Sequence, residues 1–245
     1  MLSGLYSAAA GMAAQQERID GVANDLANSE TTGYKHVRVG FRDLLYNRQG
    51  DGAGPTVMAG AGAAAAFVGR GQQQGPTRET GEPLDVAIAG PGWLEVKRPD
   101  GSLALTRDGS LRLDATGRLT TQDGLLVQPP IAVPRGTAPD QVAIGADGTV
   151  RVGDGAPLGR IRLVTVPAPD GLLALGGNLF AATAASGGTT AATGATLRQG
   201  ALEGSNVDVG DAMVAMIDAQ RSFQLASKAI QLQDQMLEVA NQVKR

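Results

Sequence analysis

The side chains that could do chemistry are few and do not form a recognisable catalytic pattern. The sequence has a single histidine, His36, and no cysteine. A Ser-His-Asp or Cys-His site would have to use His36, which follows a helix stop among cations and has no nucleophile motif nearby. With one His and no Cys, only scattered carboxylates remain as metal ligands. The sequence therefore predicts a packed or exposed His36 and no catalytic, cofactor or metal site.

Glycine-rich and aromatic motifs offer no better binding site. Gly90-Pro91-Gly92 lacks the third glycine of a dinucleotide motif and leads into a strand-like run, and Gly69-Arg70-Gly71 lies in a low-complexity stretch. A carbohydrate-binding module usually needs clustered aromatic residues, whereas this chain has one tryptophan, Trp93, in an apolar run typical of a core strand. We expect no small-molecule substrate, and a carbohydrate-binding module is the least favoured function.

Charge and hydropathy exclude further classes of function. The 21 Lys and Arg residues nearly balance the 24 Asp and Glu residues, for a net charge of -3, and they are scattered along the chain. Phosphate binding needs clustered cations, so nucleic acid is not an expected partner. No apolar run reaches the ~18 residues that a membrane span requires. The first 20 residues lack the basic start of a cleaved signal peptide, so export would need another route.

Both ends of the chain carry a heptad pattern of apolar residues. The N-terminal stripe is Leu5, Met12, Ile19 and Leu26, and the C-terminal stripe is Val209, Met216, Phe223, Ile230 and Leu237. Such a stripe is typical of a helix that packs along another helix. Nothing helical lies between the two, so they are best explained by packing against each other or against other copies. We expect a coiled coil whose stripes form the assembly interface, with a C-terminal helix over about 209–243 that is capped by Asn206 or Asp208.

The middle of the chain has the pattern of an antiparallel β domain. Asp-Gly pairs recur at 100–101, 108–109, 123–124, 147–148, 154–155 and 170–171. Short strand-like runs lie between them, at 84–88, 93–96, 103–106, 125–127 and 161–166. Asp-Gly favours type I′ hairpin turns, in which both central residues have positive φ. This pattern predicts β-hairpins.

The predicted fold is α+β, with long N- and C-terminal helices that form a coiled coil and a central antiparallel β-hairpin domain. Residues 1–46 form the N-terminal helix and turn, and 47–80 form an extended Gly/Ala-rich connector. Residues 81–205 form the β domain, and 206–245 form the C-terminal helix, which pairs with the first.

Two segments resemble a known family. Residues 23–35, ANDLANSETTGYK, are similar to the signature of the flagellar axial proteins, the rod and hook family, and 199–207, QGALEGSNV, resembles the entry to that family's C-terminal helix. The residues that carry the resemblance are Asn24, Leu26, Asn28, Thr31, Gly33, Tyr34, Lys35, Asn206 and Val207. Further matches cover most of the chain outside the connector and the loop at 181–196.

The resemblance implies a structural subunit of the bacterial flagellar basal-body rod, closest to the distal-rod type and next to the proximal-rod type. The terminal helices would line the rod's inner tube, and the β domain would lie outside it. The implied partners are copies of itself in an open helical filament, other rod and hook proteins, and the flagellar type III export apparatus. The rod would cross the periplasm and transmit torque from motor to hook, with no cofactor. A phage or secreted fibre subunit is the structural alternative, and its trimer would close with threefold symmetry.

Overall fold

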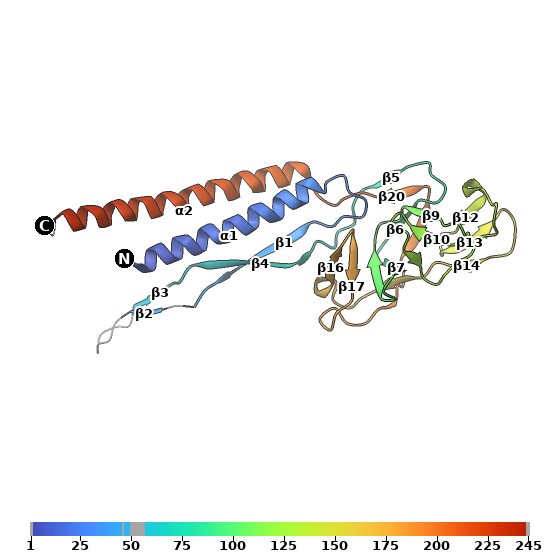
Figure 1. Ribbon diagram of the computed structural model, residues 1–245, viewed down its shortest axis with the longest axis horizontal. Helices are drawn as coiled ribbons and strands as arrows, with labels where there is room; N and C mark the ends of the chain where they lie inside the picture. The colour runs from blue at the N-terminus through green and yellow to red at the C-terminus, as the bar shows by residue number, and fades with distance from the viewer. Residues whose placement is uncertain (1, 46, 50–56, 244–245) are drawn as a thin grey trace. The chain divides into compact units, whose positions relative to one another are not determined.

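The computed structural model describes residues 2–45, 47–49 and 57–243 (Figure 1). The chain divides into two compact units, which are described separately. Unit 1 comprises Met1–Ala27, Val37–Val68 and Asp208–Arg245, and unit 2 comprises Asn28–His36 and Gly69–Val207. Residues 37–68 thus group with the terminal helices, whereas the predicted ranges divided them between the N-terminal segment and the connector. The reason is that they form strands that pack on a helix.

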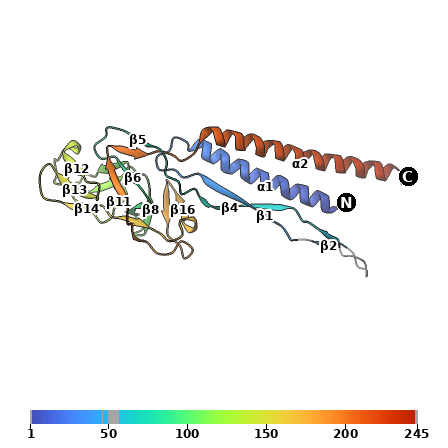
Figure 2. The same cartoon turned by 180° about the vertical axis from the view of Figure 1, so that it is seen from behind.

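Unit 1 contains the two long helices, α1 (Leu2–Ala27) and α2 (Val209–Val243). They lie side by side and run in opposite directions, so the start of α1 is near the end of α2 (Figures 1 and 2). The start of α2 is capped by Asp208, whose Oδ1 accepts a hydrogen bond from the Asp211 backbone N–H at 3.1 Å. The predicted extent of the C-terminal helix is confirmed, with Asp208 as its cap. None of the helices in the described part of the chain is long and apolar enough to cross a membrane.

A two-stranded ribbon completes unit 1. Strand β1 (Val37–Asp43) pairs with β4 (Ala63–Arg70), and β2 (Asn47–Gln49) pairs antiparallel with β3 (Val57–Ala59). The ribbon packs on α1: a Cβ added at Gly21 would lie 3.1 Å from Val39 Cγ2. Asp25 Oδ1 also accepts the Val37 backbone N–H at 2.9 Å. The range 47–80, expected as an extended connector, therefore contains paired strands.

Unit 2 is built from antiparallel β-structure, because the paired strands in its described residues run in opposite directions. The largest sheet has the order β16-β17-β8-β7-β11-β10-β9, with β15 paired to β7 and β18 paired to β15. Smaller sheets have the orders β12-β13-β14, β19-β6 and β20-β5. The strands are β5 (Thr77–Glu79), β6 (Val86–Ala89), β7 (Trp93–Lys97), β8 (Leu103–Thr106), β9 (Leu111–Leu113), β10 (Leu119–Thr121), β11 (Leu126–Val127), β12 (Val142–Ile144), β13 (Thr149–Val152), β14 (Gly159–Arg160), β15 (Leu163–Thr165), β16 (Leu173–Gly176), β17 (Leu179–Ala181), β18 (Thr190–Ala191), β19 (Thr196–Gln199) and β20 (Ala201–Glu203).

The core of unit 2 consists of branched aliphatic residues from many short strands. Its largest cluster includes Val86, Ile88, Leu94, Leu119 and Val127, each fully buried. A second cluster surrounds Trp93, which packs edge-to-face on Phe180 with 5.0 Å between ring centroids. Trp93 is thus a core residue, as the sequence predicts. Burial of these side chains supplies the main stabilisation of unit 2.

The hairpin turns differ from the expected type. Gly101, Gly124 and Gly148 have φ values of 86°, 78° and 88°, while their Asp neighbours do not have positive φ. Each of these glycines donates its N–H to the residue three positions earlier, for example Gly101 to Arg98 O at 2.9 Å. The type I′ prediction was wrong, because only the glycine is left-handed. The pattern fits a type I turn followed by a left-handed residue, the usual three-residue hairpin loop.

Candidate functional site

The predicted heptad residues mostly lie on the partly buried side of each helix. Leu5, Met12, Ile19 and Leu26 of α1 are half-buried, as are Met216, Phe223, Ile230 and Leu237 of α2, whereas Val209 is exposed. Ala14 and Ala219 are fully buried among them, and Gln233 lies against Gly4 of α1. Small residues between large ones let the two helices approach closely. In a single chain, this stripe is largely occupied by contact between α1 and α2.

One polar atom in this helix pair lacks a partner. Gln15 Oε1 is buried and makes no hydrogen bond in the described structure. A buried, unsatisfied acceptor costs about 1–3 kcal/mol, because it has lost its bonds to water. Gln15 therefore weakens the packing of α1.

A second apolar row on α2 is exposed and is not covered by other described parts of the chain. We call Val214, Leu225, Leu232, Met236 and Val239 the outer row; each is 57–69% exposed. At 3.6 residues per turn these residues share one stripe, on the side of α2 opposite the predicted heptad stripe. Arg221 and Lys228 interrupt the row and are also exposed. A stripe of large apolar side chains in water is typical of a surface that contacts another protein.

Unit 2 contains a buried cluster of charges around Glu203, at the end of β20. Lys35 Nζ lies 2.6 Å from Glu203 Oε1, and Arg107 Nη1 lies 2.8 Å from Oε2. The three side chains are 0–5% exposed. Lys35 also donates to Gln73 O at 2.6 Å. Burial lowers the pKa of Lys35 even though the hydrogen bond and charge of Glu203 oppose that shift.

The remaining donors of this cluster are also satisfied. Arg107 donates from Nε to Gly92 O at 3.0 Å and from Nη2 to Gly90 O. Its guanidinium lies 5.7 Å from the centroid of the Trp93 ring. The backbone N–H of Gly75 donates to Glu203 Oε1 at 2.9 Å. The Glu203 carboxylate thus balances the charge of one of the two buried cations. It also accepts hydrogen bonds from three separate segments of unit 2.

Asn206 forms a second, polar tie beside this cluster. Its Oδ1 accepts the His36 backbone N–H at 2.7 Å, and its Nδ2 donates to Gly71 O and Gln73 O at 3.2 and 3.0 Å. The His36 ring is half-buried, with Nδ1 3.3 Å from the same Oδ1. His36 and Asn206 are thus in contact, and the geometry places His36 in a structural hydrogen-bond network.

The other residues of the predicted motif lie at the end of α1 and in the turn that follows it. Gly33 is buried with φ +67°, and an added Cβ would lie 2.7 Å from the backbone of Arg107. Tyr34 is buried, with the guanidinium of Arg70 5.1 Å from its ring centroid. Asn28 and Thr31 bond to each other in the turn after α1, Leu26 and Val207 are half-buried, and Asn24 is exposed. The motif therefore describes a turn and a packed junction.

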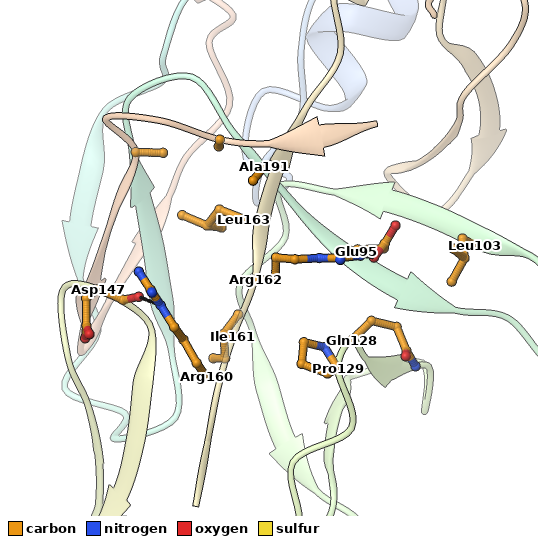
Figure 3. Close-up of a pocket in the computed structure, with 12 residues that line it drawn as sticks. Glu95, Leu103, Gln128, Pro129, Asp147, Arg160, Ile161, Arg162, Leu163 and Ala191 are labelled. Carbon is orange, nitrogen blue, oxygen red and sulfur yellow. Dashed lines mark hydrogen bonds and ion pairs between the residues drawn. The ribbon is translucent and has the colours of Figure 1, made fainter. Parts of the chain in front are cut away.

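A pocket in unit 2 has a cavity volume of about 560 Å³ (Figure 3). Its charged residues are occupied by protein partners. Arg162 points toward the buried Glu95 and pairs with it, and Arg160 donates from Nε to the backbone O of Asp147 at 2.6 Å. Among the residues that line the pocket there is no Ser, His, Lys or Tyr. Nor do the described residues include a group of three or more His, Asp or Glu side chains placed to hold a metal ion.

The sequence alone did not identify two of these features. Glu203 and Arg107 lie in the recognised segments, but nothing in their spacing shows that they meet Lys35. The outer row had a signal that could have been found, because Leu225, Leu232 and Val239 are also seven residues apart. It was missed because the heptad stripe on the opposite side of the helix has larger residues and fewer charges.

Comparison with known proteins gives matches along the whole chain. Residues 5–35 match the family model described as flagella basal body rod protein, 87–152 match the flagellar hook protein FlgE/F/G D1 domain, and 198–243 match the flagellar basal body rod FlgEFG protein C-terminal domain. The chain is 40% identical to flagellar basal-body rod protein FlgG of Borreliella burgdorferi, with 100% of both chains covered. It is 37% identical to FlgG of Bacillus subtilis over 100% of both chains, and 34% identical to FlgF of Escherichia coli over 90% of both.

Proposed function

Because this chain belongs to the family of flagellar basal-body rod proteins, we propose that it builds the distal part of the rod. It is a structural subunit of the rod and not an enzyme. The distal assignment is supported by full-length matches to FlgG relatives at up to 40% identity, against 34% over 90% of the chain for FlgF. The proximal rod is the second candidate.

The outer row of α2 is the observation that best supports assembly through the helices. Its side chains are more than half exposed, and burying a large aliphatic side chain fully is worth about 1.5–3 kcal/mol. A second copy that covers the row would gain this free energy at several positions along one helix. The outer row and the heptad stripe are different surfaces of α2. One copy can therefore contact its neighbour through the outer row while its own contact between α1 and α2 stays intact. Such a heterologous contact repeats as an open helix.

The heptad stripe has a separate role in this proposal. Its residues form the seam of an antiparallel coiled coil between α1 and α2, which holds the pair as one assembly element. Leu5, Met12, Ile19 and Leu26 face this seam from α1, and Met216, Phe223, Ile230 and Leu237 face it from α2. Residues 1–46 and 206–245 then act together as the inner part of the subunit, and 81–205 act as the outer β domain.

The partners follow from this placement. They are further copies of the chain, other rod and hook proteins, and the flagellar export apparatus, which would deliver the subunit. In a cell with two membranes this rod would cross the periplasm. The scattered charges and the net charge of -3 support neither nucleic acid nor an anionic surface as a partner.

Deletion of the gene in its own cells, followed by electron microscopy of isolated basal bodies, tests the assignment. We expect basal bodies with a short rod stump and no hook, and recovery of swimming when the wild-type gene is returned. If the stump also lacks the other proximal-rod subunits and therefore ends closer to the motor, the result would favour the proximal role. Complete rods and hooks without this chain would contradict the proposal. Purified chain that forms closed trimers would instead support a fibre subunit.

A further inference from the structure

The chain passes between its two units at four places, and all four begin in one bonded cluster of unit 2. The crossings lie at 27–28, 36–37, 68–69 and 207–208. On the unit 2 side, these crossings lead into the segments 28–36, 69–75 and 203–207. If those segments moved independently, force applied to one crossing would not reach the others.

Hydrogen bonds join these three segments pairwise. Gly33 N donates to Glu203 O at 2.8 Å, which joins the first segment to the third. Arg70 Nη1 donates to Lys35 O at 2.8 Å, and Gly71 N donates to His36 O at 2.9 Å, which join the first to the second. The contacts of Asn206 described above tie the third segment to both others. These bonds are short-range and partly accessible to water.

The Glu203 cluster lies beneath this network and has no access to water. Its carboxylate contacts Lys35 in the first segment, Gly75 in the second and Arg107 at the end of β8, while Glu203 itself belongs to the third. The charges of Lys35, Arg107 and Glu203 sum to +1. Moving the first or the third segment would leave a buried charge unpaired, and moving the second would remove hydrogen bonds from both Lys35 and Glu203. Both penalties make the arrangement rigid.

We propose that Glu203 is a positioning residue that fixes the four crossings of the chain as one rigid set, so that the subunit can transmit torque. This inference rests on the role of the chain as a rod subunit. Simple stabilisation of unit 2 would require only charge neutrality around Arg107. Positioning requires in addition the direct tie between Glu203 and Lys35, and the two roles are therefore separable.

Two variants separate them. Glu203→Gln keeps the shape but changes the net charge of the cluster from +1 to +2, and we expect it to lower the melting temperature of the β unit by about 10 °C. Lys35→Met keeps the Glu203–Arg107 ion pair, so the charge around Arg107 stays neutral, but it lacks the tie. We expect Lys35→Met to keep most of the wild-type melting temperature while the segments become mobile. Arg78→Met with Glu30→Gln is the matched control, because that exposed ion pair also links the first segment to a strand of unit 2.

Distances between spin labels measure the mobility directly. Since the chain has no cysteine, Ser29→Cys and Gln72→Cys provide two specific labelling sites in the first and second segments. Full-length wild type and the control pair should give narrow distance distributions in double electron–electron resonance. The Lys35→Met variant should give a distribution at least twice as wide and cells that do not swim. A distribution as narrow as that of wild type, or normal swimming despite a wide one, would overturn the proposal. The labels report on the monomer, so the distance result does not depend on the rod assignment. Absence of the wild-type chain from basal bodies would contradict the rod assignment alone.

Discussion

Replacement of Leu225 by Asp places a charge in the outer row of α2 and should block assembly without unfolding the monomer. Leu225 is 69% exposed in the single chain, so the substitution removes little packing there. Exposed substitutions of this kind change the free energy of unfolding by about 0.5 kcal/mol or less. In the assembled rod, however, the same position would be covered by a neighbouring copy.

The magnitude follows from the exposed fraction. Full burial of a leucine side chain is worth about 1.5–3 kcal/mol, and about two-thirds of that remains to be gained at Leu225, or roughly 1–2 kcal/mol. An unpaired carboxylate buried in the contact adds a penalty of several kcal/mol. A total of ~4 kcal/mol corresponds to an association weaker by about 1,000-fold. Leu225→Ala removes only the apolar contact and should weaken association by about 5- to 30-fold.

The assay compares the amount of each variant in isolated basal bodies with its circular dichroism as a monomer. Gln220→Asp is the matched control, since Gln220 is exposed and lies about 140° around the helix from Leu225. We expect Leu225→Asp to be absent from basal bodies, with monomer helicity unchanged, and Gln220→Asp to be incorporated normally. Normal incorporation of Leu225→Asp would refute the idea that the outer row is an intersubunit contact. Equal loss for both variants would show that added charge anywhere on α2 is harmful.

Three further predictions concern stability. Gln15→Leu should stabilise the helix pair by about 1–2 kcal/mol, because it removes a buried acceptor without a partner. Thermal unfolding followed by circular dichroism measures this change, and a lower melting temperature would show that Gln15 Oε1 is satisfied. Gly109→Ala should cost ~3 kcal/mol or more in chemical denaturation, because its Cβ would lie 1.7 Å from Val86 O, whereas Gly188→Ala, which meets nothing within 4 Å, should have little effect. Burial raises the pKa of the Asp108 carboxyl above 3.8, so the folded chain holds the carboxyl proton more tightly than the unfolded chain does. The folded chain therefore loses stability as pH rises from 3.8 through the raised pKa of the folded state. Asp108→Asn should therefore be more stable than wild type at pH 7 and similar to it below pH 3.8, and an advantage that does not depend on pH would contradict this cause.

The helices and the order of the elements could be predicted because their signals are local. A seven-residue repeat identified both helices, and the C-terminal helix spans Val209–Val243 as expected. Several strands were also found near their true positions, since short apolar runs are bounded by glycine turns. For example, the run at 103–106 is β8, and 93–96 lies within β7. The turn type was not predictable from Asp-Gly alone, because the pair also suits a type I turn with a left-handed glycine.

The pairing of distant segments could not be predicted in the same way. The Ala-rich run at 63–70 has the composition of a connector, yet it forms β4 because β1 offers it a partner strand. Likewise Lys35 and Glu203 are 168 residues apart, and neither residue type suggests burial. Such contacts are set by tertiary structure. The resemblance to rod proteins identified the segments that contain them but not the interaction that joins them.

Photo-crosslinking from position 232 tests whether the outer row of α2 contacts a second copy of the chain. Leu232 lies in the middle of the outer row, and a photo-reactive residue there contacts whatever covers α2 in the assembled flagellum. Irradiated cells, followed by isolation of basal bodies and mass spectrometry, identify the partner. We expect a crosslink to a second copy of this chain in the rod fraction and none in dilute purified monomer. If position 232 forms no crosslink to another rod subunit in intact basal bodies, the outer row is not an intersubunit contact.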